Sequence, residues 1–87
     1  MSLQEQFEAA AKRLQDNASV ADSLDNDKKL EIYALYKQGM VGDVNTDRPG
    51  MLDLKGKAKW DAWNAKKGTP KEDAQKAYIE LIEALLA

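Results

Sequence analysis

The sequence contains no cysteine and no histidine. Without cysteine the chain has neither disulfide bonds nor thiolate metal ligands. Without histidine it lacks the commonest general base and the commonest metal ligand. No apolar run approaches the roughly 18 residues of a membrane-spanning helix, and no signal-peptide pattern opens the chain. We therefore expect a water-soluble, cytoplasmic protein that uses no metal or other cofactor.

Catalytic motifs are absent as well. The sequence offers no Ser/His/Asp set, no cysteine nucleophile and no glycine-rich phosphate loop. Its paired carboxylates, Asp25 with Asp27 and Glu72 with Asp73, fall at predicted helix starts. There they complement the helix dipole, which is explanation enough for them. We expect a binding protein and not an enzyme.

Charge is distributed unevenly along the 87 residues, whose net charge is −2. Residues 1–27 carry 2 basic and 6 acidic side chains, a net of −4. Residues 28–76 carry 11 basic and 7 acidic side chains, a net of +4, and residues 77–87 add −2. A basic middle in an acidic protein predicts a local anion site. It argues against nucleic-acid binding, which usually needs a wide positive surface.

Apolar spacing predicts an all-α fold in one domain over residues 1–87. The expected helices cover about residues 3–16, 25–41, 54–67 and 70 onward, with residues 16–23 as a polar loop. Gly42 and Gly68 should end the second and third helices in the left-handed conformation that glycine adopts freely.

The start of the last predicted helix carries the pattern of a capping box. Thr69 would cap the helix, Pro70 would occupy its first turn, and Glu72 would bond back to the cap. The connection over residues 42–53 is the unusual one, because antiparallel neighbours in a bundle usually need only about 2–8 linking residues. A loop of that length lets the second and third helices run parallel, as an overhand connection.

Two faces carry the candidate chemistry. On the second helix, Tyr33, Tyr36 and Lys37 share one side, where rings can stack and a cation can meet phosphate. On the third, Lys59 lies beside Trp63. Each face alone is explained as well by half-buried core tyrosines, inward tryptophans and solvated lysines. Together they favour a ligand that is both anionic and aromatic.

Three segments resemble the acyl-CoA-binding protein family: YALYKQ, VGDVNTDRPGMLDLKGKAKWDAWN and GTPKEDAQKAYI. The resemblance covers essentially the whole chain and is strongest over residues 33–79. It implies a four-helix up-down-down-up bundle with an overhand loop between helices two and three. It also implies binding of medium- and long-chain acyl-CoA esters by a stand-alone carrier.

The resemblance assigns roles to eight residues. Tyr33, Tyr36 and Lys37 would hold the nucleotide, and Lys59 would bind phosphate. Tyr78 would be the family's tyrosine on helix four, and Ala10 and Ala11 would line the path of the acyl chain. Gln15 stands near a position where the family often has lysine, and its amide would hydrogen-bond a phosphate without adding charge. Lys29 stands where many members have an apolar residue.

Two other functions remain open at this stage. A helical interaction module would use Tyr33, Tyr36, Trp60 and Trp63 as interface anchors. A free fatty-acid carrier would need only a partner for a carboxylate, and several lysines with stacking rings favour the nucleotide ester over it. The expected partner is a long-chain acyl-CoA, bound by a monomer that contacts membranes or acyl-CoA-using enzymes transiently.

Overall fold

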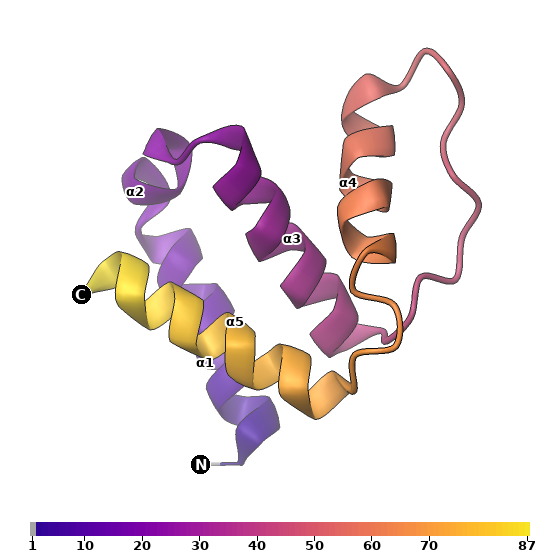
Figure 1. The fold of residues 1–87 in the computed structure, drawn as a ribbon. Coiled ribbons are helices and arrows are strands. Elements are labelled where there is room, and N and C mark those ends of the chain that lie inside the picture. The colour runs from indigo at the N-terminus through magenta and orange to yellow at the C-terminus, as the bar shows by residue number, and fades with distance from the viewer. Residues whose placement is uncertain (1) are drawn as a thin grey trace.

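The computed structural model describes residues 2–87, and this part of the chain is helical with no strand. Five helices follow one another along it: α1 (Leu3–Asp16), α2 (Ala18–Ser23), α3 (Asn26–Met40), α4 (Leu54–Asn64) and α5 (Lys71–Leu86). Figure 1 shows that α1 and α5 run one way while α3 and α4 run the other way, side by side and parallel. The predicted up-down-down-up arrangement with its overhand loop is confirmed.

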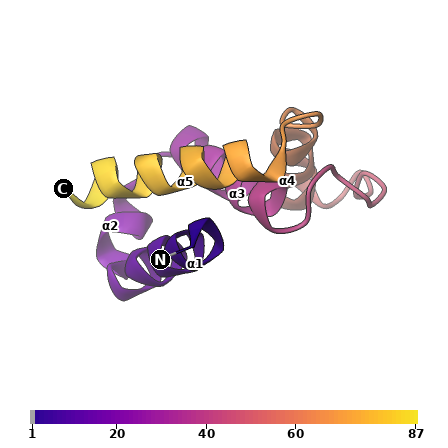
Figure 2. The ribbon, with the colours of Figure 1, turned by 90° about the horizontal axis from the view of Figure 1, so that it is seen from below.

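The molecule is flat, with dimensions of 39 × 29 × 15 Å. Helix α5 packs across α1 and α3, whereas α4 packs mainly against α3. Viewed from below, α4 and its loop lie at one end of the molecule and α2 at the other (Figure 2). Helix α3 therefore lies between α4 on one side and the pair of α1 and α5 on the other (Figure 1).

The core joins the three helices α1, α3 and α5. Its buried members are Phe7, Ala10, Ile32, Leu35, Tyr78 and Ile82. Helix α3 approaches its neighbours closely at Gly39, where an added Cβ would lie 3.1 Å from the Phe7 ring and 3.0 Å from Gln75. Such tight packing fixes how α3 lies against α1 and α5.

Helix ends follow local hydrogen bonding, and here one prediction was wrong and one cap was not predicted. Helix α1 begins with a capping box between Ser2 and Glu5 that the sequence analysis missed. The capping box expected at Thr69 does not form: α5 begins at Lys71 with Pro70 as its N-cap and no side-chain cap bond. The Thr69 carbonyl instead accepts a hydrogen bond of 2.8 Å from the side chain of Gln38.

The polar loop expected after α1 was also wrong in part. Residues Ala18–Ser23 form the short helix α2, and six residues are too few to show an apolar period. Helix α4 ends at Asn64, three residues before the expected end. Gly42 has a φ angle of 98° and directly follows Val41, the C-cap of α3, so the predicted left-handed stop there is confirmed. Gly68 has a φ angle of 92°, but the C-cap of α4 is Ala65, so the prediction that Gly68 ends this helix was wrong.

The tryptophans of α4 hold the long loop over residues 42–53. The indole N–H of Trp63 donates to the carbonyl of Gly42, and that of Trp60 donates to the carbonyl of Thr46, each at 2.8 Å. Trp63 is buried and Trp60 half-buried. Both rings therefore serve the fold, which accounts for the tryptophans without a ligand.

Carboxylates fix the same loop at two further points. Arg48 donates two hydrogen bonds, of 2.8 and 2.9 Å, to Asp61 on α4, and this guanidinium lowers the pKa of Asp61. Asp43 accepts from the backbone N–H of Gly68 and from the side chain of Gln38, and these bonds, the Gly68 one first, lower its pKa. The overhand loop is thus anchored along its length.

Candidate functional site

Helices α3 and α4 face each other through two pairs of side chains, each of which places a lysine over an aromatic ring. The ammonium group of Lys59 lies 5.4 Å from the ring centre of Tyr33, and that of Lys37 lies 5.0 Å from the ring centre of Trp63. Tyr33 and Lys37 are four residues apart on α3, and Lys59 and Trp63 are four residues apart on α4. The earlier residue of one helix contacts the earlier residue of the other, so the two helices must run parallel and in register. The overhand loop therefore brings the two predicted faces together.

A ring-walled cavity of about 320 Å³ opens between α1, α3 and α5, and we call it the tyrosine cavity. The rings of Tyr36 and Phe7 stack with centres 5.5 Å apart, and Tyr36 and Tyr78 lie 5.7 Å apart. A flat heteroaromatic ligand can stack in such surroundings. The cavity is lined by Ala11, Leu14, Gln15, Lys29, Ile32, Tyr33, Tyr36 and Tyr78.

Tyr78 is only 2% exposed, yet it borders this cavity. Burial, and to a lesser degree the neighbouring Tyr36, raises the pKa of Tyr78 from 10.0 to about 12. The hydroxyl therefore stays neutral at physiological pH and keeps its proton to donate.

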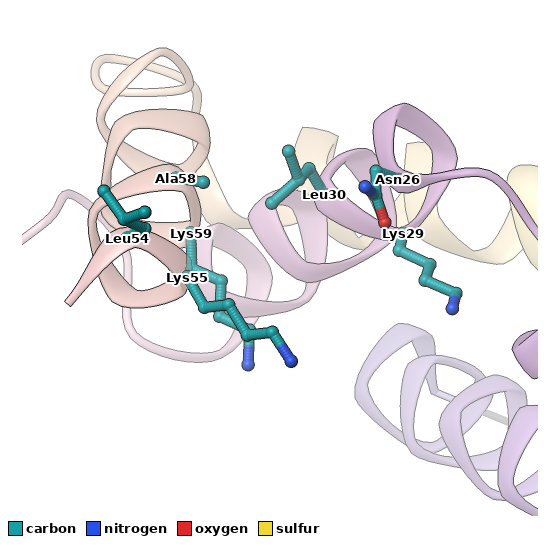
Figure 3. Close-up of a pocket in the computed structure, with 7 residues that line it drawn as sticks. All are labelled: Asn26, Lys29, Leu30, Leu54, Lys55, Ala58 and Lys59. Atoms are coloured by element: carbon teal, nitrogen blue, oxygen red, sulfur yellow. The ribbon is translucent and has the colours of Figure 1, made fainter.

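A second cavity, of about 420 Å³, lies between α3 and α4, and we call it the α3/α4 groove. In Figure 3, Leu54 and Ala58 of α4 lie across from Leu30 of α3, while the long side chains of Lys55 and Lys59 extend together to one side. The groove thus has apolar walls and a cationic edge. Its lining residues are Asn26, Lys29, Leu30, Leu54, Lys55, Ala58 and Lys59.

The two cavities adjoin. Lys29 lines both of them, and Lys59 of the groove lies over Tyr33 of the tyrosine cavity. Among residues 2–87, the structure shows no ion pair for Lys29, Lys55 or Lys59. By contrast, Lys66 pairs with Glu31 at 2.7 Å. The junction of the cavities therefore carries unneutralised positive charge.

Some predicted site residues lie at the edge of this arrangement. Lys37 is half-buried against Trp63 and lines none of the cavities described here. Gln15 lines the tyrosine cavity and also a third cavity of about 360 Å³ beside Lys12 and Met40. Ala11 borders these same two cavities, whereas Ala10 is 3% exposed and belongs to the core.

The apolar walls of the groove were not predicted from the sequence. Leu30 lies outside the quoted segments, and Leu54 and Ala58 lie within one of them but were assigned no role. Each alone resembles an ordinary bundle residue. The available signal was that Leu54 and Ala58 are four residues apart on the same helix as the lysines. That signal becomes informative only once α3 and α4 are known to run parallel, because only then does Leu30 lie across from them.

The described residues contain neither a helix long and apolar enough to cross a membrane nor a cluster of candidate metal ligands. What they contain is a ring-walled cavity, an apolar groove and free lysines between the two. The fold and the site thus define a small helical protein whose adjoining cavities and unpaired lysines are chemically suited to an amphiphilic anion with an aromatic group.

Comparison with known proteins agrees with that class. The family model described as "Acyl CoA binding protein" matches residues 4–82. The chain belongs to the acyl-CoA-binding protein family, as its sequence motifs predicted.

Individual relatives span similar lengths. The chain is 66% identical over 62 residues to acyl-CoA-binding protein homolog 1 of Caenorhabditis elegans, covering 71% of this chain and 72% of the relative. It is 57% identical over 88 residues to a homolog from Manduca sexta, covering 100% and 94%. The crystal structure of Oryza sativa acyl-CoA-binding protein 2 superposes with a TM-score of 0.89 at 45% identity, covering 98% of this chain and 91% of that one.

Proposed function

We propose that this protein binds medium- and long-chain acyl-CoA esters and carries them through the cytoplasm as a monomer. The observation that carries the proposal is the junction of the tyrosine cavity with the α3/α4 groove, with unpaired lysines between them. An acyl-CoA has the matching parts in the matching order: an aromatic base, several phosphates and an alkyl chain.

The nucleotide end fits the tyrosine cavity. Its adenine would stack against Tyr33 and Tyr36, and the neutral Tyr78 hydroxyl would donate a hydrogen bond to the head group. Lys59, whose ammonium lies over Tyr33, would meet a phosphate, and Lys37 would add charge from the neighbouring turn. Ala11 and Gln15 would border the adenine, with the Gln15 amide in reach of a phosphate.

The alkyl chain fits the α3/α4 groove between Leu30, Leu54 and Ala58. This assignment places the chain away from Ala10 and Ala11, because Ala10 is buried in the core and Ala11 borders the rings. Each methylene removed from water contributes up to about 0.8 kcal/mol, before ordering costs reduce the total. Chain burial would thus set most of the affinity, and the head group would set orientation and specificity.

The function so proposed is binding and transfer, without catalysis. The protein-interaction module is disfavoured because Trp63, one of its four proposed anchors, is only 4% exposed. The free fatty-acid carrier is disfavoured because a carboxylate alone would leave the tyrosine cavity unused.

Calorimetric titration with palmitoyl-CoA, free CoA and free palmitate tests the proposal. We expect palmitoyl-CoA to bind far more tightly than either part, because CoA lacks the alkyl term and palmitate lacks the phosphates and the adenine. Equal affinity for palmitate and palmitoyl-CoA would make the protein a fatty-acid carrier. Undetectable binding of palmitoyl-CoA would exclude the proposed function.

A further inference from the structure

Three large apolar side chains are exposed together at the end of the long loop and the start of α4. Met51 is 84% exposed, Leu52 is 99% exposed and Leu54 is 72% exposed. We call these three residues the apolar tip. Single exposed apolar residues are ordinary on a protein surface, but neighbouring ones mark a surface that meets a partner.

The tip is held outward by the structure around it. The backbone N–H of Asp53 donates to the carbonyl of Gly50 at 3.1 Å, closing a turn around Met51 and Leu52. The Asp53 carboxylate then caps α4 by accepting from the N–H of Gly56 at 2.9 Å. The Arg48–Asp61 ion pair anchors the loop just before the tip. These contacts fix the apolar side chains in an exposed position.

The charge beside the tip is positive. Lys55 and Lys57 follow within one helical turn of Leu54, and neither makes an ion pair among residues 2–87. The only acid between Met51 and Lys57 is Asp53, whose carboxylate is engaged as the helix cap. Exposed apolar side chains followed by lysines are suited to the interface of an anionic bilayer, where the apolar groups leave water and the lysines meet lipid phosphates.

We propose that the apolar tip is a docking surface for anionic membranes. Leu54 belongs to the tip and also lines the α3/α4 groove, so the docked protein would present the open end of that groove to the lipid. An acyl chain could then pass between bilayer and groove with little exposure to water. This passage rests on the proposed function, whereas the docking itself does not need a bound ligand.

Sedimentation with vesicles of equal parts phosphatidylserine and phosphatidylcholine, compared with pure phosphatidylcholine, tests the docking. We expect the ligand-free protein to bind the anionic vesicles and to lose binding as salt rises. The double variant Met51→Ser/Leu52→Ser should bind at least roughly tenfold more weakly, since two large side chains no longer leave water. Met40→Ser, at the opposite end of the parallel helix pair, is the matched control and should bind like the parent.

A fluorescent label separates tip insertion from loose electrostatic attraction. Because the chain has no cysteine, Leu52→Cys accepts one environment-sensitive, thiol-reactive dye, and Glu83→Cys on α5 gives the control position. We expect a blue shift on anionic vesicles only for the dye at residue 52. The proposal is overturned if the parent does not bind anionic vesicles, or if Met51→Ser/Leu52→Ser binds them as tightly as the parent does. It is also overturned if the emission of both dyes shifts equally on these vesicles.

Two further measurements keep the interpretations apart. Met51→Ser/Leu52→Ser should bind palmitoyl-CoA in solution like the parent, so loss of vesicle docking with retained ligand binding concerns the tip alone. Failure of the parent to bind palmitoyl-CoA, with docking intact, would refute the proposed function and leave the docking surface standing. If the parent forms a dimer in the absence of vesicles and the double variant does not, the tip binds a second copy of the chain, and the membrane proposal is overturned.

Discussion

Replacing Lys59 with methionine separates the charge of the site from its packing. The Lys59 ammonium lies 5.4 Å from the ring centre of Tyr33, at the junction of the tyrosine cavity with the α3/α4 groove. Methionine keeps an unbranched apolar stem that still covers the ring but carries no cation. The substitution therefore removes a phosphate partner while leaving the cavity wall in place.

Two different magnitudes are expected from Lys59→Met. Losing a hydrogen bond to a charged group should weaken palmitoyl-CoA binding by roughly 1.5–3 kcal/mol, which is on the order of 10- to 150-fold. Losing an exposed cation–π contact should lower the free energy of unfolding by about 0.5–1 kcal/mol at most. Binding should thus suffer more than stability.

The assay is calorimetric titration of palmitoyl-CoA at low and high salt, together with urea unfolding. Lys76→Met, an exposed lysine on α5 away from the site, serves as the matched control. We expect Lys59→Met to show weaker binding and a smaller salt dependence than the parent, and Lys76→Met to match the parent. If Lys59→Met and Lys76→Met bind equally well, Lys59 does not hold a phosphate and the head-group assignment is wrong.

Three further predictions concern stability. Gly39→Ala should lower the urea midpoint, because crowding the Phe7 ring costs about 1–3 kcal/mol and outweighs the roughly 1 kcal/mol that alanine gains in a helix; a raised midpoint would contradict the tight crossing. Asp43 and Asp61 have lowered pKa values. Their contribution to the free energy of unfolding is therefore present above about pH 4 and is lost as pH falls through their folded-state pKa values. The gap in urea midpoint between the parent and Asp43→Ala/Asp61→Ala should therefore close in acid, and a constant gap would refute this. Tyr78, whose pKa is raised to about 12, contributes stability that is present below pH 10 and is lost between pH 10 and 12, by roughly 2–3 kcal/mol at about 1.4 kcal/mol per pH unit; Tyr78→Phe should flatten that loss in an alkaline unfolding series.

Most of the fold could be predicted because its signals are local. Gly42 ends α3 as expected, and the length of the loop over residues 42–53 correctly indicated parallel helices. The errors have local causes too. Helix α2 is too short to show an apolar period. At the start of α5, the Thr69 carbonyl accepts a hydrogen bond from the Gln38 side chain, and no threonine side chain caps the helix.

Only part of the candidate site could be predicted from the sequence. Tyr33, Tyr36 and Lys37 share one face by simple helical spacing, and a matching motif named Lys59. The walls of the groove could not be found in this way, because Leu30 meets Leu54 and Ala58 only through the register of two parallel helices. Residue spacing also could not separate Ala10 from Ala11: one is buried in the core while its neighbour borders a cavity.

The proposal that one ligand spans both cavities is tested most directly by nuclear magnetic resonance. The methyl signals of Leu30, Leu54 and Ala58 report on the α3/α4 groove, and the ring signals of Tyr33 and Tyr36 report on the tyrosine cavity. We expect free CoA to shift the ring signals alone and palmitoyl-CoA to shift the ring and methyl signals together. Binding of palmitoyl-CoA that leaves the three groove residues unshifted would contradict the account.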